Sequence, residues 1–210
     1  TVDGQLLGTW SKPTSETVNI YAGTNENAEL SNFANRPFVP TSSVPVALGI
    51  IENFKTVEGA FQAEKLLYTD YFSSLQIPPK GKTREDIVNE RNEFLRKLST
   101  ATGAEAKRIG KTIPSLNITN WDDNSSRIMK DLLKSSFEQN PNALQILLAT
   151  GNKVLTHTQD KSRWGTEFPK LLMEVREELR PIDPGTQLNL FGENKPAGRP
   201  PTKRSGSECD

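Results

Sequence analysis

The sequence is poor in cysteine and histidine, and these shortages argue against two classes of protein. Its single cysteine, Cys209, is the last residue but one, so no internal disulfide framework is expected. Its single histidine, His157, argues against a zinc site of the usual His and Cys type. We therefore expect neither a metal ion nor a redox cofactor.

Long apolar runs are also missing. No stretch approaches the roughly 18 residues that a membrane-spanning helix needs, and no charged-then-apolar signal segment opens the chain. An excess of charge of one sign is absent as well, because Lys plus Arg and Asp plus Glu number 26 each. We expect a cytoplasmic protein without a membrane partner, in which any binding of a polyanion depends on a local basic patch.

Composition divides the 210 residues into three parts. Residues 1–16 are polar and predicted to be an N-terminal arm. Residues 17–180 carry the regular apolar patterns of one domain with a sizeable core. Residues 181–210 are rich in Pro and Gly and are predicted to be a disordered tail.

Helical patterns dominate the central part. β-Branched clusters at 18–20, 44–46 and 50–51 predict short strands. The apolar spacing then predicts helices over 57–68, 84–98, 104–110, from Ser125 or Ser126 to about 137, over 143–150 and over 169–179. The fold class is therefore α+β, mostly α, a single domain with short N-terminal strands and a helical core.

One predicted helix carries a polar stripe beside its apolar face. Glu58, Gln62 and Lys65 lie within roughly 60° of one another around the helix 57–68. A carboxylate and an amine at the edge of a buried face can have shifted pKa values and reach a common ligand. From the residues alone, a solvated Glu and Lys on an amphipathic helix is the alternative.

Several blocks, in order over roughly residues 18–180, resemble the NADAR (YbiA-like) family. They are the segments 30–33 (LSNF), 56–65 (TVEGAFQAEK), 105–111 (EAKRIGK), 120–121 (NW), 136–141 (SFEQNP), 147–151 (LLATG) and 164–165 (WG). The resemblance implies a mainly helical YbiA/NADAR-like fold and cleavage of N-glycosidic bonds. Members of the family act on ribosylated aminopyrimidines of riboflavin synthesis, or remove ADP-ribose from guanine as antidotes to DarT-type toxins.

The resemblance and the stripe together give four catalytic candidates. Glu58 matches the family's motif glutamate and Trp121 its first tryptophan, while Asp160 stands near the acidic residue that precedes Trp164. Lys65 comes from the stripe, as a nucleophile for a Schiff base or as a polar helper. The family usually has His directly after the motif glutamate, and this sequence has Gly there.

We expect further residues to hold the substrate. They are Ser31, Asn32, Phe33, Gln62, Lys107, Lys111, Trp164 and Gly165. Tryptophan faces can stack on a base or sugar, and the two lysines, with Arg108, can bind a diphosphate. The alternatives are ordinary core packing for the tryptophans, a solvated helix face for the cations, a turn at Ser31 and Asn32, and a structural His157.

The tail carries two short patterns that point towards DNA. Gln187, Leu188, Leu190 and Phe191 resemble the QLxLF peptide by which bacterial polymerases and repair proteins bind the sliding clamp. The basic segment around Arg199 is similar to a minor-groove hook of the AT-hook kind. A segment that folds back on its own domain, or a merely solubilising tail, is the alternative.

These observations favour a DNA-repair hydrolase that removes ADP-ribose from guanine bases, an antitoxin to a DarT-like ADP-ribosyltransferase. The expected partners are guanine-ADP-ribosylated DNA, the ADP-ribose product, the toxin and the sliding clamp. One alternative is a small-molecule N-glycosidase acting on ribosylaminopyrimidine intermediates of riboflavin synthesis. The other is a non-catalytic module that binds ADP-ribose.

Overall fold

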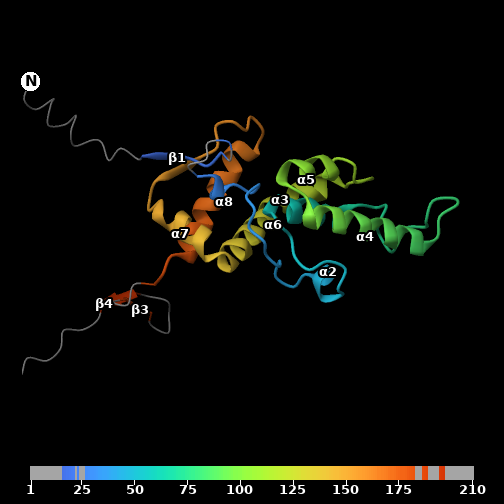
Figure 1. The fold of residues 1–210 in the computed structure, drawn as a ribbon, viewed down its shortest axis with the longest axis horizontal. Helices are drawn as coiled ribbons and strands as arrows, with labels where there is room; N and C mark the ends of the chain where they lie inside the picture. The colour runs from blue at the N-terminus through green and yellow to red at the C-terminus, as the bar shows by residue number, and fades with distance from the viewer. Residues whose placement is uncertain (1–15, 22, 24–26, 183–185, 189–193, 197–210) are drawn as a thin grey trace, which may run out of the picture. The chain divides into compact units, whose positions relative to one another are not determined.

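The computed structural model describes residues 16–21, 23, 27–182, 186–188 and 194–196. Residues 1–179 and 180–210 form two units. The first is built mainly of helices (Figure 1), which confirms the predicted class. In the second, β3 (Thr186–Leu188) pairs antiparallel with β4 (Asn194–Pro196) within the segment predicted to be disordered. Nearly all of the predicted arm, and Leu190 and Phe191 of the tail pattern, lie outside the described residues.

The strands of the first unit are few and short. β1 (Thr17–Asn19) pairs in parallel with β2 (Val154–Thr156), with Thr17 opposite Val154. The predicted strand at 44–46 is wrong, because these residues form helix α2 (Val44–Ala47). Pro45, at the start of that helix, has the backbone angle of a first helical turn and cannot donate to a strand ladder. Residues 50–51 also lie outside any strand, although the side chain of Ile51 is buried in the core.

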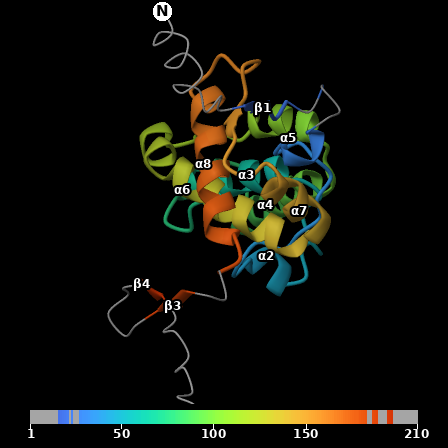
Figure 2. The same ribbon diagram turned by 90° about the vertical axis from the view of Figure 1, so that its left-hand side faces the viewer.

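Helix α3 (Val57–Glu64) is the centre of the unit, and η3 (Lys65–Tyr68) continues it. Thr56 caps α3, since its hydroxyl oxygen accepts a hydrogen bond from the Gly59 N–H at 2.9 Å. All residues of α3 except Glu64 are buried. The helix packs against α4 (Arg84–Thr100), α5 (Gly103–Gly110) and α6 (Ile118–Gln139), and it lies among them in both ribbon views (Figure 2).

Two helices begin five or more residues earlier than predicted. The side chain of Asn117 accepts from the Asn120 N–H at 3.0 Å and so starts α6 seven residues upstream of Ser125, which places Trp121 on the helix. Helix α8 (Trp164–Leu179) starts five residues before Pro169 and includes that proline. Helix α7 (Pro141–Ala149) lies between them in the chain, and Gly151 follows it with a φ of 57°.

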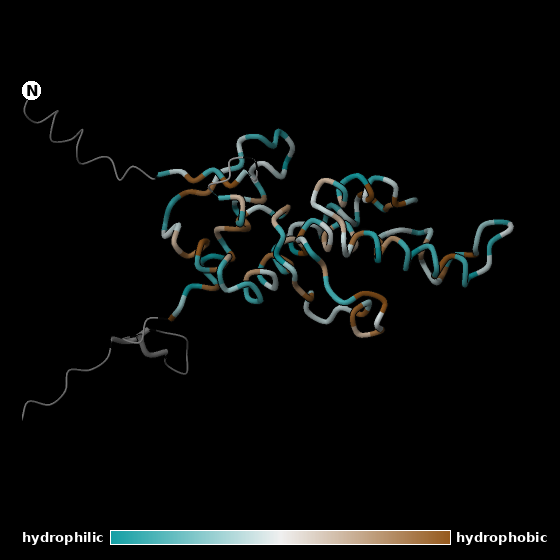
Figure 3. The backbone as a smooth tube through the Cα atoms, viewed as in Figure 1, coloured by the Kyte–Doolittle hydropathy of each residue, from teal (hydrophilic) through white to brown (hydrophobic). Residues whose placement is uncertain are grey.

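The core joins all of these helices. Hydrophobic residues recur in short stretches along each helix rather than in one long run (Figure 3). Fully buried side chains come from α3, α4, α6, α7 and α8, namely Val57, Leu98, Leu133, Phe137, Leu147, Leu172 and Val175. Within the described part of the chain, none of the helices has the length and apolarity that crossing a membrane requires. The core thus fixes α3, whose polar residues form the site described next.

Candidate active site

Glu58 lies in the first turn of α3 with its side chain only 5% exposed. One carboxylate oxygen, Oε2, accepts a hydrogen bond from Asn32 Nδ2 at 2.6 Å, and the other, Oε1, accepts from Gln62 Nε2 at 2.8 Å. The Glu58 N–H also donates to the Asn32 carbonyl at 3.0 Å. Helix and loop therefore fix the position of this carboxyl group from both sides.

The Glu58 carboxyl and the Lys65 amine influence each other's protonation. Burial raises the pKa of Glu58, and the hydrogen bond from Gln62, the charges of Lys107 and Lys65 and the hydrogen bond from Asn32 oppose that rise. Burial lowers the pKa of Lys65, opposed by the negative charges of Glu58 and Asp122. These shifts favour an acid that retains its proton and an amine that loses it more easily, which are the states that proton donation and nucleophilic attack require.

An aromatic wall borders this pair. The Phe61 ring centre lies 5.0 Å from that of Trp121 and 5.3 Å from that of Trp164. Trp121 is 6% exposed, and the Lys65 ammonium lies 5.7 Å from its ring centre. The Trp121 ring therefore mainly packs against Lys65. Trp164 is only partly buried, with the Arg163 guanidinium 4.9 Å from its ring centre. Of the two tryptophans, Trp164 is therefore the better placed to stack on a ligand.

Helix α5 adds exposed cations to the site. The charge of Lys107 lowers the pKa of both Glu58 and Asp160, and the charges of Lys107 and Lys111 act on Lys65. These two lysines lie one helical turn apart and so share a face. Arg108 does not join them, because it lines a largely apolar hollow formed by residues of α4 and α5. The predicted cationic cluster thus reduces to two lysines.

Asp160 lies in the loop between β2 and α8, and Gly165 is the second residue of α8. The Asp160 carboxylate accepts hydrogen bonds from the Ser162 hydroxyl at 2.6 Å and the Ser162 N–H at 2.8 Å. Burial tends to raise the pKa of Asp160, but these two bonds and the charges of Lys107 and His157 together lower the pKa overall. A side chain at Gly165 would overlap the Asp160 carbonyl oxygen. Both residues therefore shape the loop, and neither is positioned by a direct contact with Glu58.

The three residues of the SNF motif have different roles in the structure. Ser31 is buried and its hydroxyl accepts from the Phe33 N–H at 3.0 Å, so it shapes the turn. Asn32 alone contacts Glu58. The Phe33 ring, 37% exposed, packs over Gly103, where a side chain would overlap it. The motif thus positions the carboxyl group and leaves one aromatic ring at the surface.

Arg36 was not anticipated from the sequence, where it stands between polar residues and a proline. It is 1% exposed, donates to the Ser31 carbonyl at 2.8 Å, to Ser136 Oγ at 3.1 Å and to the Glu29 carbonyl, and lies 4.3 Å from the Phe137 ring centre. Burial lowers its pKa to about 10, so it remains charged at neutral pH. Arg36 therefore attaches the SNF turn to α6.

Gly59, which stands where the resemblance implies His, has a steric cause. A Cβ atom at Gly59 would lie 2.5 Å from the Leu98 carbonyl oxygen of α4. We expect Gly59→His to lower the free energy of unfolding by about 3 kcal/mol, because overpacking of this kind displaces one helix from the other. Urea denaturation measures the loss, with Ala104→His at an exposed position of α5 as the control. Equal stability of the two variants would contradict the close approach of α3 and α4.

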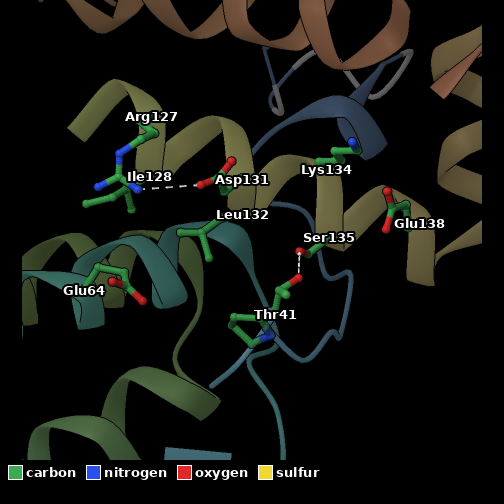
Figure 4. Close-up of a pocket in the computed structure, with 10 residues that line it drawn as sticks. Thr41, Glu64, Arg127, Ile128, Asp131, Leu132, Lys134, Ser135 and Glu138 are labelled. Carbon is green, nitrogen blue, oxygen red and sulfur yellow. Dashed lines mark hydrogen bonds and ion pairs between the residues drawn. The ribbon is translucent and has the colours of Figure 1, made fainter. Parts of the chain in front are cut away.

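A separate hollow lies on another face of α3. It has a volume of about 510 Å³ and is lined by residues of α6, by Pro40 and Thr41, and by Glu64. Figure 4 shows Glu64 on α3 near the residues of α6, among which Arg127 and Asp131 form an ion pair at 3.8 Å. Neither Glu58 nor Lys65 lines this hollow, so we assign it no part in the candidate site.

Comparisons with known proteins identify the family and the fold of the chain. The family described as NADAR domain matches residues 20–180. The chain is 28% identical over 171 residues to N-glycosidase YbiA of Shigella flexneri serotype 5b (strain 8401), covering 77% of this chain and 88% of that protein. It is 27% identical, with the same coverage, to N-glycosidase YbiA of Escherichia coli (strain K12). The NMR structure of the E. coli protein YbiA matches with a TM-score of 0.56 at 24% identity, covering 79% of this chain and 85% of that one. This last likeness concerns the fold.

Proposed function

The chain belongs to the NADAR domain family, and from that premise we propose that it hydrolyses ADP-ribose from guanine bases of nucleic acid. Its relatives are N-glycosidases, which places the chain among the hydrolases of N-glycosidic bonds. The observation that carries the proposal is the buried Glu58, with Lys65 and Lys107 acting on its charge. A carboxyl group and cations at one place suit a sugar that carries a diphosphate.

The chemistry of the bond requires two things of the site. Cleavage develops positive charge at the anomeric carbon and needs a proton on the departing nitrogen. Glu58, whose pKa is raised by burial, can give its proton to that nitrogen, and the resulting carboxylate stabilises the positive carbon. Water then adds to the carbon, and its proton returns to Glu58. The base leaves with its nitrogen protonated and the sugar gains a hydroxyl group, so the atoms balance.

Lys65 permits a second route. A sugar linked through an exocyclic amine can open to an imine, which the Lys65 amine can attack to form a Schiff base while the base departs as the free amine. Water then hydrolyses the Schiff base. The lowered pKa of Lys65, caused by burial, favours the neutral amine that this route needs.

The role proposed for the α5 cations predicts a selective loss of affinity. Lys107→Ala is expected to raise KM for an ADP-ribosylated oligonucleotide roughly tenfold, because a charge-assisted contact to the diphosphate is lost. Arg108→Ala is the matched control, because Arg108 is the cation next to Lys107 and lines the hollow between α4 and α5. The KM of this variant should stay close to that of the native chain. Equal effects of the two substitutions would contradict a specific phosphate site at Lys107.

The choice of substrate is tested by comparing two compounds. The purified chain is given a guanine-ADP-ribosylated oligonucleotide and a ribosylaminopyrimidine, and kcat/KM is measured for each. We expect the oligonucleotide to be preferred, whereas preference for the pyrimidine would support the small-molecule N-glycosidase. Tight binding of ADP-ribose without turnover of either compound would support the non-catalytic module.

The two protein partners are also proposals. We propose that a DarT-like transferase makes the substrate and that the 187–191 segment binds a sliding clamp. The second proposal rests on sequence alone, because two of its four key residues lie outside the described part of the chain and no side chain of the segment is described.

A further inference from the structure

Two side chains donate hydrogen bonds to the Glu58 carboxylate, and Gln62 is the buried one of the two. It is 5% exposed and lies one helical turn beyond Glu58 on α3, and its Nε2 donates to Glu58 Oε1 at 2.8 Å. Its other amide atom, Oε1, is buried and has no hydrogen-bond partner within the described residues. A buried acceptor without a hydrogen-bond partner costs free energy and calls for an explanation.

The Gln62 amide packs against Gly110, the last residue of α5. A Cβ atom at Gly110 would overlap Gln62 Oε1 and lie 2.5 Å from Gln62 Cδ. Gly110 has an ordinary negative φ, so the backbone conformation does not require glycine there. The glycine is explained by the space that the Gln62 amide occupies.

The hydrogen bonds described for Glu58 suit only one of its two charge states. Both Asn32 and Gln62 donate to it, which satisfies a carboxylate. A protonated carboxyl group has an O–H that needs an acceptor, and the unused Gln62 Oε1 is an acceptor on the nearest buried side chain. Turning the amide by half a rotation about its last bond exchanges Oε1 and Nε2 without changing its shape.

We propose that Gln62, backed by Gly110, is a positioning residue that serves Glu58 in both charge states. It donates to the carboxylate and, with its amide turned over, accepts from the carboxylic acid. The inference rests on the proposed function of Glu58, whose charge changes when the departing nitrogen takes its proton. Gln62 is thereby reassigned from substrate binding, since its amide is enclosed between Glu58 and Gly110.

Other charged groups around Glu58 also influence its pKa. A substitution of Gln62 therefore has to leave those groups in place. Lys65 follows α3 in the chain and Lys107 comes from α5. Asp122 of α6, and Lys111 directly after α5, act through Lys65. None of the charged groups named here lies on α4. The Gln62 hydrogen bond is the largest influence that lowers the pKa of Glu58. Removing it while keeping these charges should therefore move the Glu58 titration upwards.

The first test needs no substrate. The titration of the Glu58 side-chain carbonyl carbon is followed by NMR in the native chain and in Gln62→Met, which keeps the length but removes both polar atoms. We expect the midpoint to rise by about one pH unit, and the Gln62 amide resonances of the native chain to shift with the same midpoint. Gln145→Met, on the exposed side of α7, is the control. The rise in the midpoint is expected because the bond that Gln62 donates to the carboxylate is charge-assisted and stronger than the bond that it accepts from the acid. Gln62 amide resonances that do not change through the Glu58 midpoint would overturn the inference.

The second test isolates Gly110. Gly110→Ala is expected to lower kcat/KM roughly tenfold when Gln62 is present, and less than about twofold when Gln62 has been shortened to Ala, because the new methyl group then fills vacated space. The pH–rate limb that follows Glu58 should shift upwards only in the first case. Equal losses in both backgrounds would overturn the role of Gly110. If the native chain turns over no substrate, the proposed function fails, whereas the NMR titration still decides the inference.

Discussion

Glu58→Gln is expected to lose roughly 10³-fold or more in kcat/KM, because the amide can neither give a proton to the departing nitrogen nor carry the negative charge that stabilises the anomeric carbon. The shape of the side chain is retained, so the loss reports on chemistry and not on packing. A turned-over Gln62 amide can accept from the new N–H, which makes this variant a mimic of the protonated state.

The same substitution should not destabilise the protein. The folded-state pKa of Glu58 is raised by burial, so the folded state binds more protons than the unfolded one, and stability falls as pH rises from about 4 towards the folded pKa. Glu58→Gln removes this loss and should be at least as stable as the native chain at pH 7. An inactive but stable variant would separate catalysis from folding.

Glu64→Gln is the matched control for this prediction. Glu64 is on the same helix, and burial raises its pKa too, but it faces the hollow on another side of α3. We expect this variant to keep its kcat/KM within about twofold of the native value. Its stability should also no longer fall as pH rises towards the folded-state pKa of Glu64. Activity assays and thermal denaturation at pH 5 and pH 8 measure both. Equal activity of Glu58→Gln and the native chain would remove Glu58 from the mechanism.

Lys65→Arg is expected to lose roughly 10³-fold in kcat if Lys65 is the nucleophile, although the positive charge is kept. Arginine is not deprotonated in proteins and cannot form the Schiff base. Borohydride added during turnover should link the sugar to Lys65 in the native chain, and mass spectrometry of the digested protein locates the adduct. Lys134→Arg, on α6 beside the separate hollow, is the control.

The two outcomes for Lys65 lead to different mechanisms. A trapped adduct together with an inactive Lys65→Arg establishes the covalent route. Near-native activity of Lys65→Arg without any adduct would contradict it and leave Lys65 as a cation that acts through its charge on Glu58. Burial lowers the pKa of Lys65, so on the covalent route the rate should begin to rise at a lower pH than an exposed lysine would allow.

Local patterns in the sequence were enough to place the centre of the site. The helical spacing of Glu58, Gln62 and Lys65 put them on one stripe, and the structure keeps all three together in the continuous helical segment of α3 and η3. The predicted helix start at Ser125 or Ser126 leaves Trp121 outside the helix, because apolar spacing does not mark Asn117 as the cap. Apolar periodicity begins well inside α6 and therefore does not mark its start.

Features that depend on contacts between distant segments were beyond the sequence. Arg36 is buried against residues that include Ser136, a hundred positions later in the chain. Gly110 and Gln62 meet because α3 and α5 pack together, and no local pattern marks either as a partner of the other. The helix at 44–47 overrides a β-branched pattern. Tertiary packing decided the positions of Arg36, Gly110 and Gln62, whereas Pro45 favours the helix at 44–47 locally.

The most direct test of the account is incubation of the purified native chain with an oligonucleotide that carries one ADP-ribosylated guanine, followed by mass spectrometry of both products. The account predicts multiple turnovers that release intact ADP-ribose and restore unmodified guanine. An oligonucleotide that stays modified, or that keeps part of the ADP-ribose, would contradict it.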